Sequence, residues 1–214
     1  MMTSIVARIV TGTMLLALYA FSLQLGGVWY AGLFAASSLY ALIFEWPRLV
    51  GRWSPVLRWF TATVDFLGSF LGWVSVYETY AQVNLFWVAY PALVTVACDS
   101  GAYFVGYFFG RHYVFPAISP KKTYEGLCAG YVAVIVLNFV YAHFFYDVSG
   151  YFRLVVRYPI VFGLVIASCA VLGDLYISFL KRRVGLKDSG RLLPGHGGVL
   201  DRVGSLIFVF LLIL

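Results

Sequence analysis

The sequence predicts an all-α protein that crosses a membrane about six to seven times and carries its polar loops on the cytoplasmic side. Hydrophobic residues make up 62% of the chain and charged residues only 11%, and the mean hydropathy is +0.89. These values lie far outside the range of soluble globular domains. Apolar stretches recur along the whole length, and no long linker or internal repeat separates them. We therefore expect one integral membrane domain over residues 1–214.

Each predicted crossing is an apolar run close to the roughly 20 residues that a helix needs to span a bilayer. The first run follows Arg8 but lacks an A-x-A cleavage signal, so it is predicted to be a retained helix rather than a signal peptide. The last run ends at Leu214 after about half the length of a crossing, so this helix is expected to be incomplete or half inserted. The runs lie at 8–25, 28–45, 57–75, 85–110, 126–146, 159–180 and from 203 to the end.

The basic residues indicate how these helices are oriented. With a cytoplasmic N-terminus, alternate crossings place 13 of the 15 basic residues on the cytoplasmic side and only Arg153 and Arg157 outside. This bias follows the positive-inside rule. It also brings the loops at 111–125 and 181–202 to one face, where they can share a site. Attraction to anionic lipid headgroups is an alternative reason for the net charge of +6, but it does not explain why these residues alternate with Asp, Gly and His.

Three acids, Asp65, Asp99 and Asp174, lie within or at the ends of apolar runs. A carboxylate at membrane depth is costly and usually faces a partner or a water-filled cavity. For Asp65, a structural hydrogen bond or a headgroup contact explains the residue as well as a function does. Asp174 instead begins a polar row that shares one helical face: Asp174, Ser178, Lys181 and Arg182. An intrahelical salt bridge from Asp174 to a basic group two turns on is the alternative reading.

Small residues follow Asp99 at helical spacing. Ala102, Gly106 and Gly110 stand 3, 7 and 11 positions after it, which predicts that this face packs closely against another helix. The three cysteines, Cys98, Cys128 and Cys169, lie in apolar runs and are expected only to pack.

The octet Ser119-Pro-Lys-Lys-Thr-Tyr-Glu-Gly126 begins shortly after this stripe. Its two lysines have hydroxyl groups on either side and stand next to a turn, which is a typical environment for phosphate oxygens. A solvated pair of charges at the membrane edge is the alternative.

The longest polar segment is Ser178-x-x-Lys181-Arg182-x4-Lys187-Asp188-x7-His196-Gly197-Gly198-x2-Asp201-Arg202. Together with Gly173-Asp174-Leu175, the Asp99 stretch and the octet, in the same order, it resembles the signature of the phosphatidate cytidylyltransferases, the CDP-diacylglycerol synthases. The Arg8 helix and Glu45-Trp46 are also similar to that family. The resemblance implies transfer of CMP from CTP to phosphatidic acid, with release of pyrophosphate, for phospholipid biosynthesis. It also implies the bacterial inner membrane, with the active site on the cytoplasmic side.

The resemblance further implies the roles of individual residues. A Mg²⁺ ion is expected between Asp174 and Asp201, with Asp188 as a lesser candidate ligand. The expected catalytic residues are Asp174, Lys122, Lys187, Asp188, Asp201 and Arg202. The expected substrate contacts are Asp99, Ser119, Lys121, Lys122, Ser178, Lys181, Arg182, His196, Gly197 and Gly198. The expected partners are CTP, phosphatidic acid and membrane lipids, without nucleic acid, and a homodimer is left open.

One position departs from the family pattern. The family continues Asp-Arg-x-Asp, whereas Gly204 stands here in place of the second acid. Loss of that acid would weaken metal binding or the orientation of Arg202. Two alternatives therefore stay beside the transferase: a catalytically impaired membrane homologue, and a CTP-dependent polyprenol or lipid kinase that transfers the γ-phosphate instead.

Overall fold

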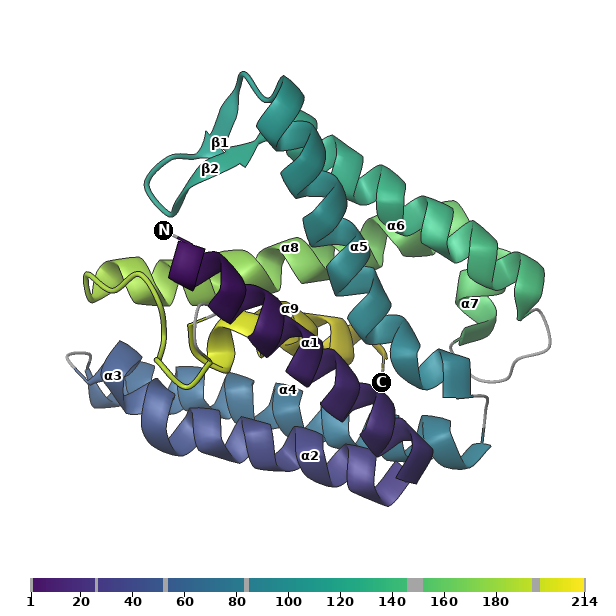
Figure 1. Cartoon of the computed structure of the whole chain (residues 1–214), viewed down its shortest axis with the longest axis horizontal. Coiled ribbons are helices and arrows are strands. Elements are labelled where there is room, and N and C mark those ends of the chain that lie inside the picture. Colours follow the sequence, from purple (N-terminus) through teal and green to yellow (C-terminus); the bar gives the residue numbers. More distant parts are fainter. Residues whose placement is uncertain are drawn as a thin grey trace.

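The chain folds into a bundle of long helices, which confirms the predicted all-α membrane class (Figure 1). The computed structural model describes residues 2–25, 27–51, 54–82, 85–145, 152–193 and 197–213. Its long helices are α1 (Met2–Leu25), α2 (Gly27–Tyr40), α4 (Pro55–Gln82), α5 (Leu85–Phe109), α6 (Tyr124–Phe144), α8 (Pro159–Arg183) and α9 (Leu200–Ile213). Three short helices join them: the π-helix η1 (Ala41–Glu45), α3 (Trp46–Val50) and α7 (Phe152–Arg157).

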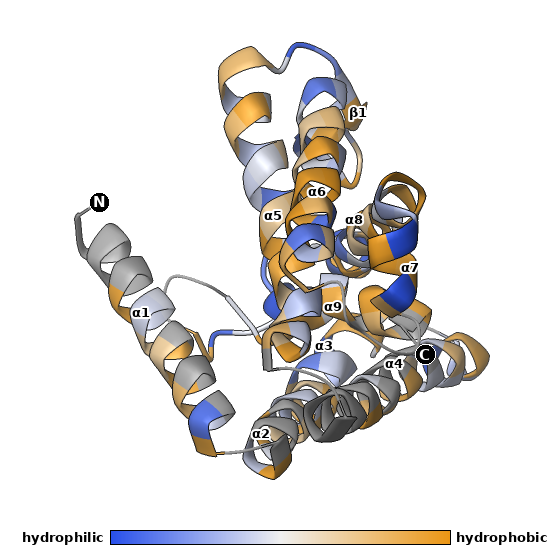
Figure 2. Ribbon diagram, turned by 90° about the vertical axis from the view of Figure 1, so that its right-hand side faces the viewer, coloured by the Kyte–Doolittle hydropathy of each residue, from blue (hydrophilic) through white to orange (hydrophobic). Residues whose placement is uncertain are grey.

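Three helices in the described part of the chain are long and apolar enough to cross a membrane: Phe86–Phe109, Tyr124–Phe144 and Pro159–Arg183. Hydrophobic residues make up much of α5 and α6, as a bilayer requires (Figure 2). The other predicted crossings coincide with α1, with α2 and η1, and with α4. The total of six to seven crossings stays a prediction.

A β-hairpin stands where a loop was predicted between α5 and α6. Strand β1 (Tyr113–Phe115) pairs antiparallel with β2 (Ser119–Thr123), which contains both lysines of the octet. Thr123 has an extended backbone and caps α6, because its hydroxyl accepts a hydrogen bond from the Gly126 amide at 3.2 Å. Glu125 fixes the start of the hairpin, since its carboxylate accepts hydrogen bonds from the amides of Arg111 and His112 just before β1.

The two loops that the charge pattern assigned to one face lie together at one end of the bundle (Figure 1). The hairpin and the loop after α8 are joined there by Arg182, whose Nε donates to the carbonyl of Ile118 at 3.3 Å. The helix α7 lies at the opposite end. This arrangement confirms that the two polar loops meet.

The stripe of small residues after Asp99 packs against α6, as predicted. A Cβ atom on Gly126 would lie 2.6 Å from the carbonyl oxygen of Ala102, and one on Gly130 would lie 2.8 Å from that of Cys98. Both distances are shorter than real contacts of a Cβ atom, so α5 and α6 approach closely only because these positions are glycine.

Gly204 forms a second close contact, between α8 and α9. A Cβ atom on Gly173 would lie 2.5 Å from the carbonyl oxygen of Gly204, and one on Gly204 would overlap the side chain of Ile177. The space beside position 204, where the signature that the sequence resembles has an acid, is therefore filled here by the neighbouring helix. A larger side chain at 204 requires Ile177 to move.

We expect Gly204→Ala to lower the thermal midpoint of unfolding in detergent by several degrees. Overpacking of this kind typically costs about 1–3 kcal/mol. The matched control is Gly32→Ala in α2, because a Cβ atom there meets nothing within 4 Å. Equal midpoints for the two variants would show that the α8–α9 contact is loose.

Candidate active site

Asp174 is paired with a lysine from the hairpin rather than with its own helix. Its Oδ2 atom lies 2.6 Å from Nζ of Lys122, and both side chains are partly exposed. The intrahelical salt bridge considered for Asp174 is therefore wrong, because the cation comes from β2. The polar row on α8 therefore does not pair within itself: Asp174 binds Lys122 of β2, and Lys181 binds Asp201 of α9.

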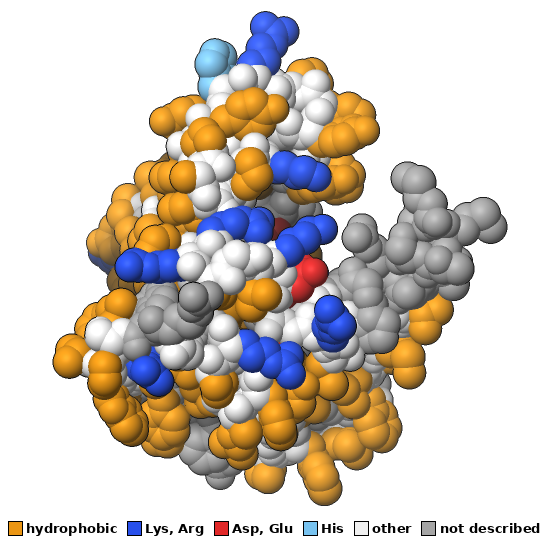
Figure 3. Space-filling model, turned by 90° about the vertical axis from the view of Figure 1, so that its left-hand side faces the viewer, with side chains coloured by type: hydrophobic (Ala, Val, Ile, Leu, Met, Phe, Trp, Pro, Cys, Tyr) orange, Lys and Arg blue, Asp and Glu red, His pale blue; other side chains and the backbone are white. Residues whose placement is uncertain are grey.

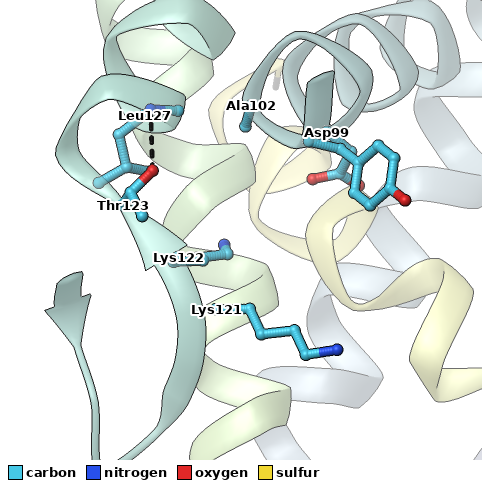
Figure 4. Close-up of a pocket in the computed structure, with 8 residues that line it drawn as sticks. Asp99, Ala102, Lys121, Lys122, Thr123 and Leu127 are labelled. Atoms are coloured by element: carbon cyan, nitrogen blue, oxygen red, sulfur yellow. Dashed lines mark hydrogen bonds between the residues drawn. The ribbon is translucent and has the colours of Figure 1, made fainter. Parts of the chain in front are cut away.

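Asp99 faces Lys121 and Lys122 across a pocket of about 170 Å³ (Figure 4). The pocket lies between α5 and β2, and its polar lining includes Asp99, Lys121 and Lys122. Asp99 also lies close enough to Lys122, Asp174 and Arg202 for their charges to interact. Side chains from α5, β2, α8 and α9 thus converge on one centre.

Asp201 makes several internal contacts at the start of α9. Its Oδ1 atom lies 2.6 Å from Nζ of Lys181, and its Oδ2 atom accepts hydrogen bonds from the amides of Ser189 and Gly198 at 2.8 and 2.9 Å. The side chain is only 7% exposed. Partial burial alone would raise the pKa of Asp201, but the hydrogen bonds from Lys181, Gly198 and Ser189 outweigh it and hold this pKa below the usual value. Asp201 thereby ties the loop after α8 to the first turn of α9.

Glu45 closes this loop from the opposite side. It is 1% exposed, and its carboxyl group accepts hydrogen bonds from the amides of Val199 and Leu200 at 2.8 and 2.9 Å. The Ser189 hydroxyl lies 2.8 Å from Glu45 and 3.0 Å from Asp201, and its single hydrogen can serve only one acid at a time. An acidic group here suits the start of α9, where amides lack helical partners and the helix dipole is positive.

The backbone before Glu45 explains how the residue reaches the loop. The amide of Trp46 bonds to the carbonyl of Ala41, which makes the π-turn of η1, and Pro47 follows directly. A π-turn changes the helical register by one residue and redirects the side chains after it. Trp46 and Leu49 then pack against Ile177 and Leu180 of α8, which anchors Glu45 beside the loop.

The two glycines after His196 fit around these acids. Gly197 has a positive φ of 84°, and a Cβ atom there would lie 2.6 Å from Oδ2 of Asp201. A Cβ atom on Gly198 would lie 2.5 Å from Oε2 of Glu45. The amide of Gly197 donates to the Leu193 carbonyl, and that of Gly198 donates to Asp201. In this structure both glycines close the loop.

The remaining predicted residues are distributed around the same end of the molecule. Lys187, Asp188 and Arg202 are exposed, Ser119 is half-buried and Ser178 is buried. Arg182 joins the hairpin to the loop, because it also donates to the carbonyl of Leu186 at 3.0 Å. Figure 3 shows Lys and Arg side chains around a hollow in which an acidic side chain is visible. His196 and the side chain of Asp65 lie outside the described residues.

The two acids that were expected to bind Mg²⁺ are each paired with a lysine. Within the residues that the structure describes, no group of three or more His, Cys, Asp or Glu side chains could hold a metal ion. Asp174 and Asp201 belong to separate ion pairs. That they share one ion stays a prediction. Glu45, by contrast, was not predicted as a site residue, because its partners are amides 154 and 155 positions away in the chain.

Comparison with known proteins gives one consistent match. The model of the cytidylyltransferase family matches residues 51–214. A phosphatidate cytidylyltransferase of Helicobacter pylori is 35% identical over 237 aligned positions, which cover 96% of this chain and 86% of that protein. One of Haemophilus influenzae is 36% identical over 171 residues, and one of Bacillus subtilis is 41% identical over 134. The chain spans 59% and 46% of the lengths of these last two relatives.

Proposed function

The chain belongs to the cytidylyltransferase family, and from this we propose that it transfers CMP from CTP to phosphatidic acid. A phosphate oxygen of the lipid attacks the α-phosphorus of CTP. The bond from that phosphorus to the oxygen bridging to the β-phosphate breaks, and pyrophosphate leaves. The product is CDP-diacylglycerol. No side-chain nucleophile is required, because the lipid phosphate itself attacks.

The convergence of Asp99, Lys122, Asp174 and Arg202 from four different elements carries this proposal. Two anions have to approach each other, and negative charge grows on the leaving pyrophosphate. Cationic side chains fixed around the reacting phosphates lower both costs. Lys121 and Lys122 of the pocket at β2 are suited to the CTP phosphates.

We propose that Asp174 holds Mg²⁺ at this centre. Mg²⁺ commonly takes one or two carboxylates together with substrate phosphates, so the neighbouring Asp99 and Asp174 fit such an ion in their donor chemistry. When bound, the ion would neutralise phosphate charge. Asp201 can offer Oδ1 as the predicted second ligand only if Lys181 moves away. Binding of the ion to Asp174 would release Lys122 from this carboxylate, so that the lysine could turn towards the phosphates.

The two acids are expected to respond differently to substitution. Asp174→Asn should raise the Mg²⁺ concentration needed for half-maximal turnover about tenfold or more, since loss of even an outer-shell partner of a ligand typically costs about 10–100-fold in metal affinity. Asp201→Asn should mainly lower the thermal midpoint, because it removes the partner of Lys181. A Mg²⁺ titration and a melting curve for each variant make the comparison. An equal shift in Mg²⁺ requirement would instead support the shared ion.

We further propose that the site lies at the cytoplasmic surface of the inner membrane. The last turns of α5, beside the hairpin, expose five aromatic side chains, which are typical of a membrane–water interface. These are Tyr103, Phe104, Tyr107, Phe108 and Phe109. Acyl chains could then stay in lipid while CTP arrives from water.

Cysteine labelling in intact cells should test this orientation. In a cysteine-free background, Pro120→Cys and Arg191→Cys should be protected from an impermeant reagent, because both exposed positions belong to the basic loops. Arg153→Cys at the opposite end is the control and should be labelled. Labelling of only one loop position would show that the crossing count is wrong.

The activity itself is tested with purified protein, CTP and phosphatidic acid in detergent micelles. We expect CDP-diacylglycerol and pyrophosphate in equal amounts. Release of CDP with a newly phosphorylated lipid would mean γ-phosphate transfer and would refute the proposal.

A further inference from the structure

A second and larger pocket lies next to the site, with Arg202 in its lining. Its volume is about 440 Å³, within the usual range of ligand pockets. The walls come from α1, α2, α5 and α9 and from the loop that precedes α9. They are almost entirely apolar and include Leu33, Ala92, Leu206 and Phe210.

Arg202 connects this apolar pocket to the polar centre. Among the described residues that line the pocket it is the one that is charged, and it also lies close enough to Asp99 of the pocket at β2 for their charges to interact. The preceding residue, Asp201, is fixed by Lys181, Ser189 and Gly198, so the backbone that carries Arg202 is held in place. An apolar chamber with a guanidinium beside a phosphate-transfer centre matches an amphiphile with an anionic head.

We infer that this pocket binds one acyl chain of the phosphatidic acid and that Arg202 holds the lipid phosphate. The inference rests on the proposed function and adds to it the place of the lipid. An acyl chain gains little hydrophobic energy on moving from bilayer to protein, because both surroundings are apolar. The pocket therefore acts by orienting the lipid, so that its phosphate faces the α-phosphorus of CTP.

A tryptophan that fills the pocket should discriminate between long and short lipids. Leu33→Trp places a large ring at the pocket wall, whereas Leu39→Trp makes the same change on the same helix at a side chain that is 58% exposed and lies outside the lining. For dioleoyl phosphatidic acid, Leu33→Trp should lower kcat/KM about tenfold or more, as a pocket that no longer fits its substrate does. For dihexanoyl phosphatidic acid, and for the KM of CTP, the values should stay close to those of Leu39→Trp. Equal losses for both lipids, or for both variants, would overturn the inference.

A readout that does not depend on turnover separates this inference from the proposed function. A phosphatidic acid with a diazirine at the end of one acyl chain should form adducts on the segments that contain Leu33 and Leu206. Leu33→Trp should reduce these adducts and Leu39→Trp should not, and Leu206→Trp provides a second pocket variant if Leu33→Trp does not fold. Equal labelling by the corresponding phosphatidylcholine would mean bulk lipid and would refute a phosphate-selective site. Selective adducts on a chain that forms no CDP-diacylglycerol would refute the proposed function alone, and turnover without selective adducts would refute the pocket alone.

Discussion

Lys122→Ala is expected to lower kcat about 100-fold or more, the effect typical of removing a charge partner of the transition state. In the resting structure Nζ of Lys122 lies 2.6 Å from Asp174, and the side chain also lines the pocket that we assign to the CTP phosphates. The charge that it compensates grows as pyrophosphate leaves, so the loss should fall on kcat more than on KM. Initial rates over a range of CTP concentrations would measure both constants.

Two controls define what this result means. Arg153→Ala removes an exposed cation at the opposite end of the bundle and should leave both constants nearly unchanged. Adding Asp174→Asn to Lys122→Ala should not restore turnover if the lysine acts on phosphate. If the double variant recovers most of the activity, Lys122 serves only to neutralise Asp174, and the hairpin is a membrane-edge turn without a catalytic role.

The helices were predictable because each is a local feature of the sequence. Runs of about 20 apolar residues mark them, and the spacing of Ala102 and Gly106 marked the face on which α5 meets α6. The hairpin was not predicted, because a pair of strands of three and five residues carries too little alternation to stand out beside lysines and a proline. The count of crossings alone decides on which side each loop lies. It was therefore possible to predict that the segment of the hairpin and the loop after α8 share one end of the bundle.

The partners of the charged residues could not be read from the sequence. The spacing on α8 suggested that Asp174 and the basic residues after it act as one row, yet the fold gives Asp174 to Lys122 and Lys181 to Asp201. Similarly, Gly204 reads as a missing acid in the sequence but is a point of helix contact in the structure. In both cases a neighbouring element, distant in sequence, decides the role.

The loss of the Glu45 carboxylate should disorder the loop that carries Lys187 and Asp188. In Glu45→Gln an NH₂ group replaces one carboxylate oxygen and so faces the amide of Val199 or of Leu200, leaving that donor unpaired in a buried site. An unsatisfied buried group of this kind costs about 1–3 kcal/mol, and the anionic partner of the α9 dipole is lost as well. We therefore expect a lower thermal midpoint and faster proteolysis between residues 184 and 199.

Turnover should fall because this loop becomes disordered, even while the rest of the protein stays folded. At temperatures well below its midpoint, Glu45→Gln should still lose most of its kcat, because Arg202 and Asp201 begin the helix whose first amides Glu45 binds. Ser189→Ala keeps both acids but removes the hydroxyl between them, so its effect and that of Glu45→Gln should not be additive; contacting residues usually couple by about 0.5–3 kcal/mol. Melting curves of the two single variants and the double variant give this coupling. Additive changes would mean that Ser189 and Glu45 stabilise the loop independently, and full kcat in Glu45→Gln would mean that the loop holds its shape without Glu45.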